Sequence, residues 1–243
     1  MLENIISSDV LFLDIETVPQ YKSFSELPDN FKYLWEKKSL KIQTNNDLTD
    51  PEELYKRAGI YAEFGKIICI SLGVFDFRNN QRCLRITSLF GDDEKSILLD
   101  FKDILESFRK NRENIYLCAH NGKEFDFPYI ARRMLLNEIS LPEVLNVAGK
   151  KPWETTFIDT MELWKFGDHK HYTSLELLAA IFNLKSPKEE IDGSQVSSLY
   201  WDKHDFDAII KYCENDVITV AQLFLKYKGE NIIDDENILR IKR

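Results

Sequence analysis

One short segment near the N-terminus, Val10–Thr17 (VLFLDIET), limits the folds open to this chain. Its apolar residues favour a strand, and a strand that is apolar on both faces suits the centre of a sheet covered by helices on both sides. Asp14 and Glu16 are two residues apart, so their side chains share one face of a strand. Two carboxylates at the end of a buried strand repel each other and lose hydration, which a divalent cation with oxygen ligands would relieve. A strand end that has simply reached solvent would also explain the pair.

Four further segments have the composition of β-strands: 66–75, 81–90, 115–119 and 156–160. Apolar periodicity, acidic first turns and well-placed prolines predict helices at 51–64, 92–110, from Pro128 onward, 174–182 and 205–227. This order predicts an α/β fold. We expect a mixed five-stranded sheet, part antiparallel hairpin and part parallel, with helices on both faces. We interpret residues 1–243 as a single domain with an ordered, aromatic-rich insertion at 20–50 and a charged C-terminal tail at 229–243.

The composition narrows the functional classes. No segment is long enough to span a membrane, and the N-terminus lacks the pattern of a signal peptide. The four cysteines show no paired spacing, which indicates reduced thiols in a cytoplasmic protein and no zinc site. The net charge of -9 argues against a broad electrostatic footprint on duplex DNA. It leaves room for an enzyme that holds a few nucleotides in a metal-filled cleft.

Two more groups of polar residues follow or border buried elements. The run from Asn121 to Asp126 comes just after the carboxyl end of a predicted strand, where α/β sheets place their ligands. Asp126 could instead cap the helix that begins near Pro128. Tyr212 and Asp216 are four residues apart, so they share a helix face at the rim of an apolar arc. A solvated acid at a helix edge is the alternative for Asp216.

In chain order, D-I-E at 14–16, N-G-K-E-F-D at 121–126 and Y-C-E-N-D at 212–216 resemble the three motifs of the DEDD 3'-5' exonucleases. The tyrosine four residues before the last aspartate is typical of their tyrosine branch. The second motif is similar to that of the proofreading domain of family B DNA polymerases. The run 192–196 (DGSQV) is similar to the stand-alone predicted exonucleases related to that domain. The resemblance covers about 10–227 and implies a ribonuclease-H-like fold.

The resemblance also implies a mechanism and a substrate. Two divalent ions, Mg²⁺ or Mn²⁺, would be held by four acids, Asp14, Glu16, Asp126 and Asp216. It gives Tyr212 the role of orienting the attacking water. We expect the substrate to be the 3' end of a single-stranded nucleic acid, DNA in preference to RNA, contacted by Thr17, Asn121 and Phe125, although discrimination at the 2'-hydroxyl depends on pocket geometry that the sequence does not give. Ordinary core packing would explain Phe125 equally well.

Two other functional classes fit parts of the pattern. A catalytically silent nucleic-acid-binding module could share the fold, but binding phosphate requires no cluster of negative charge. A phosphodiesterase that acts on very short oligonucleotides would use the same metal chemistry. No polymerase domain fits within 243 residues, so we expect no proofreading in cis. Asp159 also ends a predicted strand, and we interpret it as a structural acid or a helix cap rather than a fifth metal ligand.

Overall fold

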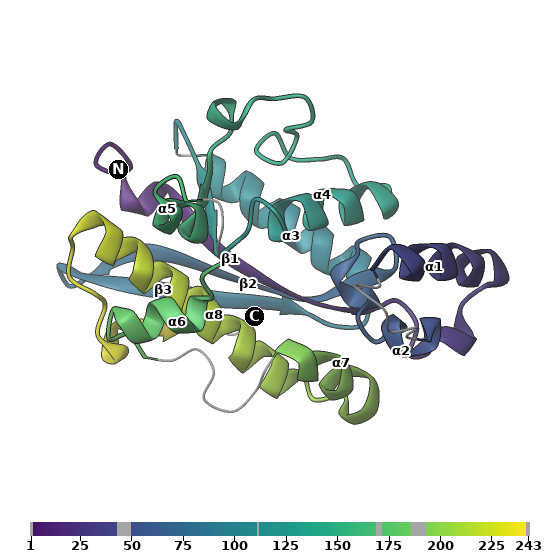
Figure 1. Ribbon diagram of the computed structural model, residues 1–243. Coiled ribbons are helices and arrows are strands. Elements are labelled where there is room, and N and C mark those ends of the chain that lie inside the picture. Colours follow the sequence, from purple (N-terminus) through teal and green to yellow (C-terminus); the bar gives the residue numbers. More distant parts are fainter. Residues whose placement is uncertain (1, 43–49, 111, 169–171, 186–192, 242–243) are drawn as a thin grey trace.

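The computed structural model describes residues 2–42, 50–110, 112–168, 172–185 and 193–241, and their centre is a twisted sheet (Figure 1). The strands are β1 (Val10–Pro19), β2 (Gly65–Arg78), β3 (Gln81–Phe90), β4 (Tyr116–Ala119), β5 (Phe157–Asp159) and β6 (Ile238–Arg240). They lie in the order β5-β4-β1-β2-β3-β6. The first three strands pair antiparallel, whereas β4, β5 and β6 pair parallel to their neighbours.

The predicted α/β class, with an antiparallel portion and parallel strands, is confirmed, but the sheet has six strands rather than five. The additional strand, β6, comes from the segment that we interpreted only as a charged tail. It pairs with β3, and the backbone N–H of Ile241 continues the pairing by donating to Ile86 O at 2.7 Å. Without β6, the long strand β3 would expose a row of unpaired backbone groups at the sheet edge.

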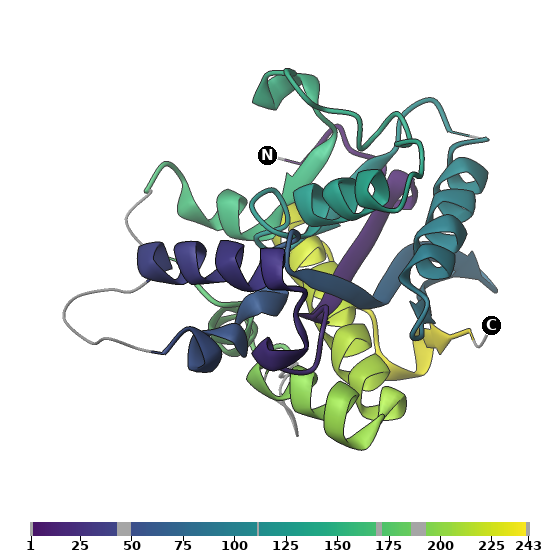
Figure 2. The same cartoon turned by 90° about the vertical axis from the view of Figure 1, so that its right-hand side faces the viewer.

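Helices cover both faces of the sheet, as Figures 1 and 2 show. They are α1 (Asp29–Ile42), α2 (Pro51–Tyr55), α3 (Glu94–Arg109), α4 (Asp126–Leu136), α5 (Thr160–Lys165), α6 (Leu175–Ile181), α7 (Val196–Ser198) and α8 (Phe206–Lys228). The helix predicted at 51–64 stops at Tyr55, and a 3-10 turn follows at Ala58–Ile60. Gly59 in that turn packs so close to β1 that an added Cβ would lie 2.9 Å from the carbonyl carbon of Val18. No helix in the described ranges combines the length and the apolar character needed to cross a membrane.

Side chains of β1 alternate between the two cores. Leu11, Leu13 and Ile15 pack in the cluster that α3 and α4 cover, whereas Val10 and Phe12 pack against α8. The α8-facing row therefore continues to positions 14 and 16, where the sequence changes from apolar residues to acids. The strand thus places the carboxylates of Asp14 and Glu16 on the sheet face that α8 covers.

The insertion at 20–50 contains α1, which packs on α2 through a separate aromatic cluster built around the fully buried Trp35. The Trp35 ring lies edge-on to Tyr55 and Phe64, with centroid separations of 5.4 and 5.1 Å. Its indole N–H donates to the carbonyl of Pro51 at 2.8 Å. Several large rings fixed in this way hold α1 firmly at the end of β1.

Candidate active site

Asp14 and Glu16 lie on the part of β1 that pairs with β2 but no longer with β4. Strand β4 pairs with β1 only from Val10 to Phe12, and it ends at Ala119. Beyond that point β1 still pairs with β2, so its other edge is open beside both acids. Glu16 is buried and Asp14 is partly exposed. The early end of β4 therefore makes room for a ligand at this edge of the sheet.

Asp126 reaches this open edge of β1 from α4, which covers the sheet face opposite α8. It is the first residue of α4 and is only 3 % exposed, and its carboxylate accepts the backbone N–H of Ile15, between the two acids of β1. The loop before it is held by Asp159, whose carboxylate accepts the N–H groups of Asn121 and Lys123, both at 3.0 Å. Asp159 also caps α5. Its contacts thus match our interpretation of a structural acid and helix cap.

The long helix α8 brings the third motif to the same place. The Cys213 thiol, one residue after Tyr212, contacts both the carboxylate and the carbonyl oxygen of Asp14, at 3.3 and 3.4 Å. Asp216 lies one turn further along, close enough for its charge to raise the pKa values of Asp14 and Glu16. The structure therefore brings together all four acids that the sequence singled out.

The segment of α8 that carries these groups is fixed from behind by a chain of polar contacts centred on Glu214. Glu214 is buried and accepts hydrogen bonds from Ser88 of β3 at 3.0 Å and from Arg240 of β6 at 2.9 Å. Ser88 in turn contacts Ser71 of β2 at 2.8 Å. Sequence reasoning missed Arg240, because only the pairing of β6 with β3 brings the C-terminal segment next to α8.

The electrostatics of the site are those of crowded negative charges. Burial, reinforced by the neighbouring acids, raises the pKa of Asp14 and that of Glu16 well above their ordinary values. The pKa of Asp126 is raised to about 7, chiefly by burial, although the two backbone N–H groups that it accepts oppose this effect. In the described part of the chain, no lysine or arginine forms an ion pair with Asp14, Glu16 or Asp126. Such a cluster gains greatly in stability when cations bind to it.

The donor set fits a hard divalent cation. Asp126 Oδ1 is buried and has no hydrogen-bond partner within the described residues, so an oxygen lone pair is available there. Ligand atoms of Asp14, Glu16 and Cys213 lie within 4.8 Å of one another. Burial raises the pKa of the Cys213 thiol well above its ordinary value, which favours the neutral thiol in the metal-free site. The remaining donors are carboxylate oxygens, which suit Mg²⁺ or Mn²⁺ rather than zinc.

The residues predicted to contact a nucleotide lie on the segments that carry Glu16 and Asp126. Asn121 has the left-handed φ of 60° that its turn requires, and its side-chain Oδ1 is buried without a partner in the described residues. Phe125 precedes α4 and packs partly against the core, as the alternative interpretation expected. Thr17 follows an irregularity in the β1–β2 pairing and is partly exposed. Thr17 directly follows Glu16 in the chain, Phe125 directly precedes Asp126, and the Asn121 carbonyl accepts the Phe125 N–H at 3.0 Å. Contacts of these three residues with a substrate stay a prediction.

Sequence reasoning missed Tyr129, which connects several of these groups. Its buried hydroxyl donates to the carbonyl of Gly59 at 2.7 Å and accepts a hydrogen bond from Thr17. Its ring lies 5.4 Å from that of Phe125. The helical spacing of three residues from Asp126 places both side chains on neighbouring parts of α4, and this spacing was the available signal.

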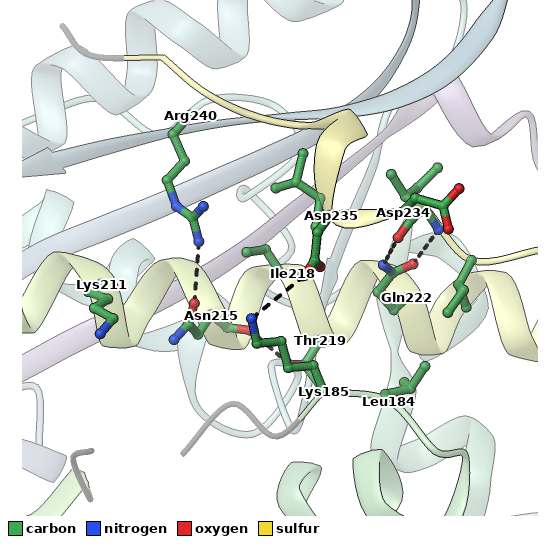
Figure 3. A pocket seen from close by; sticks show the side chains of 13 residues that line it. Leu184, Lys185, Lys211, Asn215, Ile218, Thr219, Gln222, Asp234, Asp235 and Arg240 are labelled. Atoms are coloured by element: carbon green, nitrogen blue, oxygen red, sulfur yellow. Dashed lines mark hydrogen bonds and ion pairs between the residues drawn. The ribbon is translucent and has the colours of Figure 1, made fainter. Parts of the chain in front are cut away.

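A pocket of about 410 Å³ lies along another face of α8 (Figure 3). Apolar side chains and the Lys185–Asp235 ion pair, at 3.7 Å, form part of its wall. Figure 3 also shows Arg240 reaching Asn215 across this pocket, at 3.5 Å. None of the four clustered acids lines it. We therefore assign the chemistry to the acidic site and not to the pocket.

The sequence of the chain matches a known protein family. Residues 60–236 match the family model described as a predicted 3'-5' exonuclease related to the exonuclease domain of PolB. The chain belongs to this family. The matched range contains the second and third motifs, whereas Asp14 and Glu16 precede it. No curated protein has a sequence that matches the chain.

One solved structure supports the fold of this member of the PolB-related exonuclease family. The family B DNA polymerase of the archaeon Pyrobaculum calidifontis is similar with a TM-score of 0.53 and 15% sequence identity. The similarity covers 90% of this chain and 24% of the polymerase, so the chain spans about a quarter of that protein. A chain in the structure of the yeast NOT1 MIF4G domain co-crystallised with CAF1 has a TM-score of 0.42 and 12% identity. Coverage there is 96% of this chain and 84% of the other.

Proposed function

We propose that the protein is a metal-dependent 3'-5' exonuclease that removes mononucleotides from single-stranded nucleic acid, DNA in preference to RNA. The main support is that four acids come together at the open edge of the sheet. They are Asp14 and Glu16 from β1, Asp126 from α4 and Asp216 from α8. Membership of a family of predicted 3'-5' exonucleases supports the reaction class. The overall negative charge supports a small, metal-assisted grip on the strand rather than a broad duplex interface.

The four acids have distinct roles in this proposal. Asp14, Glu16 and Asp216 would hold one divalent ion, and Asp14 together with Asp126 would hold the second, directly or through water. When bound, the ions supply activation of the attacking water and stabilisation of charge on the phosphate and the leaving oxygen. In the reaction, water attacks the terminal phosphorus and the bond to the 3' oxygen of the preceding nucleotide breaks. The products are a nucleoside 5'-monophosphate and a strand with a new 3' hydroxyl.

Tyr212 would orient the attacking water. A tyrosine hydroxyl has an ordinary pKa near ~10, so it is a poor general base at neutral pH but a good hydrogen-bond partner. It is buried, and a Cβ added at Gly193 would lie 3.4 Å from its hydroxyl oxygen. The turn Gly193–Gln195 thus limits the space around the tyrosine. Asn121, Phe125 and Thr17 would position the terminal nucleotide.

The test uses single-stranded DNA and RNA of several lengths, labelled at the 5' end, with and without Mn²⁺. We expect metal-dependent ladders that shorten from the 3' end, and Asp216→Asn should abolish them. The matched control is Asp207→Asn, which neutralises an exposed acid on the same helix. Release of a labelled mononucleotide at the earliest times would show the opposite polarity and refute the proposal. Cleavage of dinucleotides alone would identify a small-substrate phosphodiesterase, and no cleavage at all would identify a silent binding module.

A further inference from the structure

The outward face of α1 combines exposed apolar side chains with positive charge. Tyr33, Leu34 and Leu40 are 56%, 47% and 68% exposed, although side chains of this size are usually buried. The same helix carries four lysines within ten residues, namely Lys32, Lys37, Lys38 and Lys41. Within the described residues only Lys32 of these four forms an ion pair, with Asp29 of the same helix. Lys38 lies over the Tyr61 ring, with its ammonium 4.3 Å from the centroid, so the positive charge on the face opposite the buried Trp35 comes from Lys37 and Lys41.

Three of these residues form one row along the helix. Tyr33, Lys37 and Lys41 are spaced by four positions, so their side chains lie one above another on a single face. The Lys37 ammonium lies 4.4 Å from the centroid of the Tyr33 ring. An exposed ring beside regularly spaced cations is the arrangement with which proteins bind the bases and phosphates of single strands.

The row lies on a well-anchored helix in the segment that directly follows the strand carrying Asp14 and Glu16. Its opposite side is anchored by Trp35, which is fully buried and hydrogen-bonded to Pro51. From Glu16 to the end of β1 at Pro19 is about 10 Å of strand, and the insertion that contains α1 follows directly. In Figure 1, α1 lies at the right-hand end of the sheet, whereas α5 lies on the left of the view.

We propose that the row Tyr33, Lys37 and Lys41 binds the substrate strand upstream of its 3' end. This inference rests on the proposed function, because it assigns the substrate's phosphates to these lysines and a base to the tyrosine ring. Charge complementarity supports it: the catalytic acids and the net charge repel a polyanion, so retaining a strand requires cations outside the acidic site. An acidic protein partner is the competing occupant, and the interleaved lysines and exposed tyrosine favour the nucleic acid.

The test measures binding rather than cleavage. In protein carrying Asp216→Asn, the affinity for a fluorescent 16-nucleotide single strand is measured from 50 to 500 mM salt, and a trinucleotide serves as the short ligand. Lys37→Gln together with Lys41→Gln removes two proposed phosphate contacts. The plot of log affinity against log salt should therefore become shallower, with the magnitude of its slope reduced by about 1.4. Between 500 and 50 mM salt, the ratio of the unmodified protein's affinity to that of the variant should therefore grow about 25-fold. The loss should be far smaller for the trinucleotide. Tyr33→Ala should weaken binding of the 16-mer about fivefold or more.

The matched control is Lys150→Gln with Lys151→Gln, two exposed lysines outside the insertion. We expect this pair to leave both the affinity and the salt slope unchanged. An unchanged slope in the Lys37 and Lys41 variant would overturn the inference and leave α1 as a face for a protein partner. An equal loss in the control would also overturn it, as a general effect of net charge. Failure of the unmodified protein to cleave any strand refutes the proposed function separately, because this binding assay requires no cleavage.

Discussion

Replacing Asp126 by asparagine should stabilise the metal-free protein at alkaline pH. The carboxyl is buried and its pKa is raised to about 7, so the folded chain keeps a proton that an unfolded chain, with a carboxyl pKa of ~3.9, has lost. This group therefore favours folding at low pH, and its contribution is lost as the pH rises through about 7. Asparagine keeps an acceptor oxygen for the Ile15 N–H but carries no charge.

The size of the stability difference follows from the difference between the pKa of Asp126 in the folded chain and that in the unfolded chain. A difference of about three pKa units, at 1.36 kcal/mol each, makes the ionised carboxylate cost about 4 kcal/mol at pH 8. At pH 5 the folded state is protonated and the cost falls to roughly 1.5 kcal/mol. The variant Asp126→Asn should thus exceed the unmodified protein in stability by about 4 kcal/mol at pH 8, and this difference should narrow to roughly 1.5 kcal/mol at pH 5.

The assay is urea unfolding of both proteins in the presence of a chelator at pH 5 and pH 8. Titrating groups far from Asp126 cancel in the difference between the two proteins, whereas the relief of repulsion on Asp14 and Glu16 adds to the advantage of the variant at pH 8. Asp207→Asn controls for neutralising an exposed acid. Added Mg²⁺ should reduce or reverse the advantage at pH 8, because only the unmodified protein keeps the full set of acids. The predicted destabilisation by the Asp126 carboxylate would be refuted if Asp126→Asn were less stable than the unmodified protein at pH 8. It would also be refuted if the difference in unfolding free energy did not narrow at pH 5, because the Asp126 carboxyl would then have no raised pKa.

Three further substitutions test the surrounding positions. Tyr212→Phe should lower kcat by about ten- to a thousandfold with little change in metal affinity, and equal single-turnover rates in both proteins would leave the tyrosine as packing. Tyr129→Phe removes the hydroxyl that joins Thr17 to the Gly59 carbonyl. Its KM for a strand should rise more than its kcat falls, whereas a purely structural role would lower only the melting temperature. Glu94→Gln breaks the buried pair with Arg133, at 2.6 Å, and should cost about 3 kcal/mol or more in urea unfolding; a loss below 1 kcal/mol would contradict this.

The local features of the site were predictable from the sequence. The apolar run before Asp14 specifies a buried strand, and residues two apart on a strand share a face whatever surrounds them. Likewise Tyr212 and Asp216 share a helix face because of the period of the helix. Three short motifs in the right order then indicated the reaction class. These inferences succeeded because each depends on spacing within one element.

Contacts between distant segments were decided by the tertiary structure. Nothing in the local sequence of 238–240 distinguishes a sixth strand from a charged tail, because its stability comes from the unpaired edge of β3. Arg240 could be recognised as a support for Glu214 only after that pairing was known. Asp126 would cap a helix in any α/β protein, and its contact with the Ile15 N–H exists because β4 ends early and leaves that group free. The sequence by itself thus determined which groups carry the chemistry, since side-chain type and spacing are local properties. Only the fold determined how they are held together and how strongly their charges interact, since both depend on burial and on distances between elements far apart in the chain.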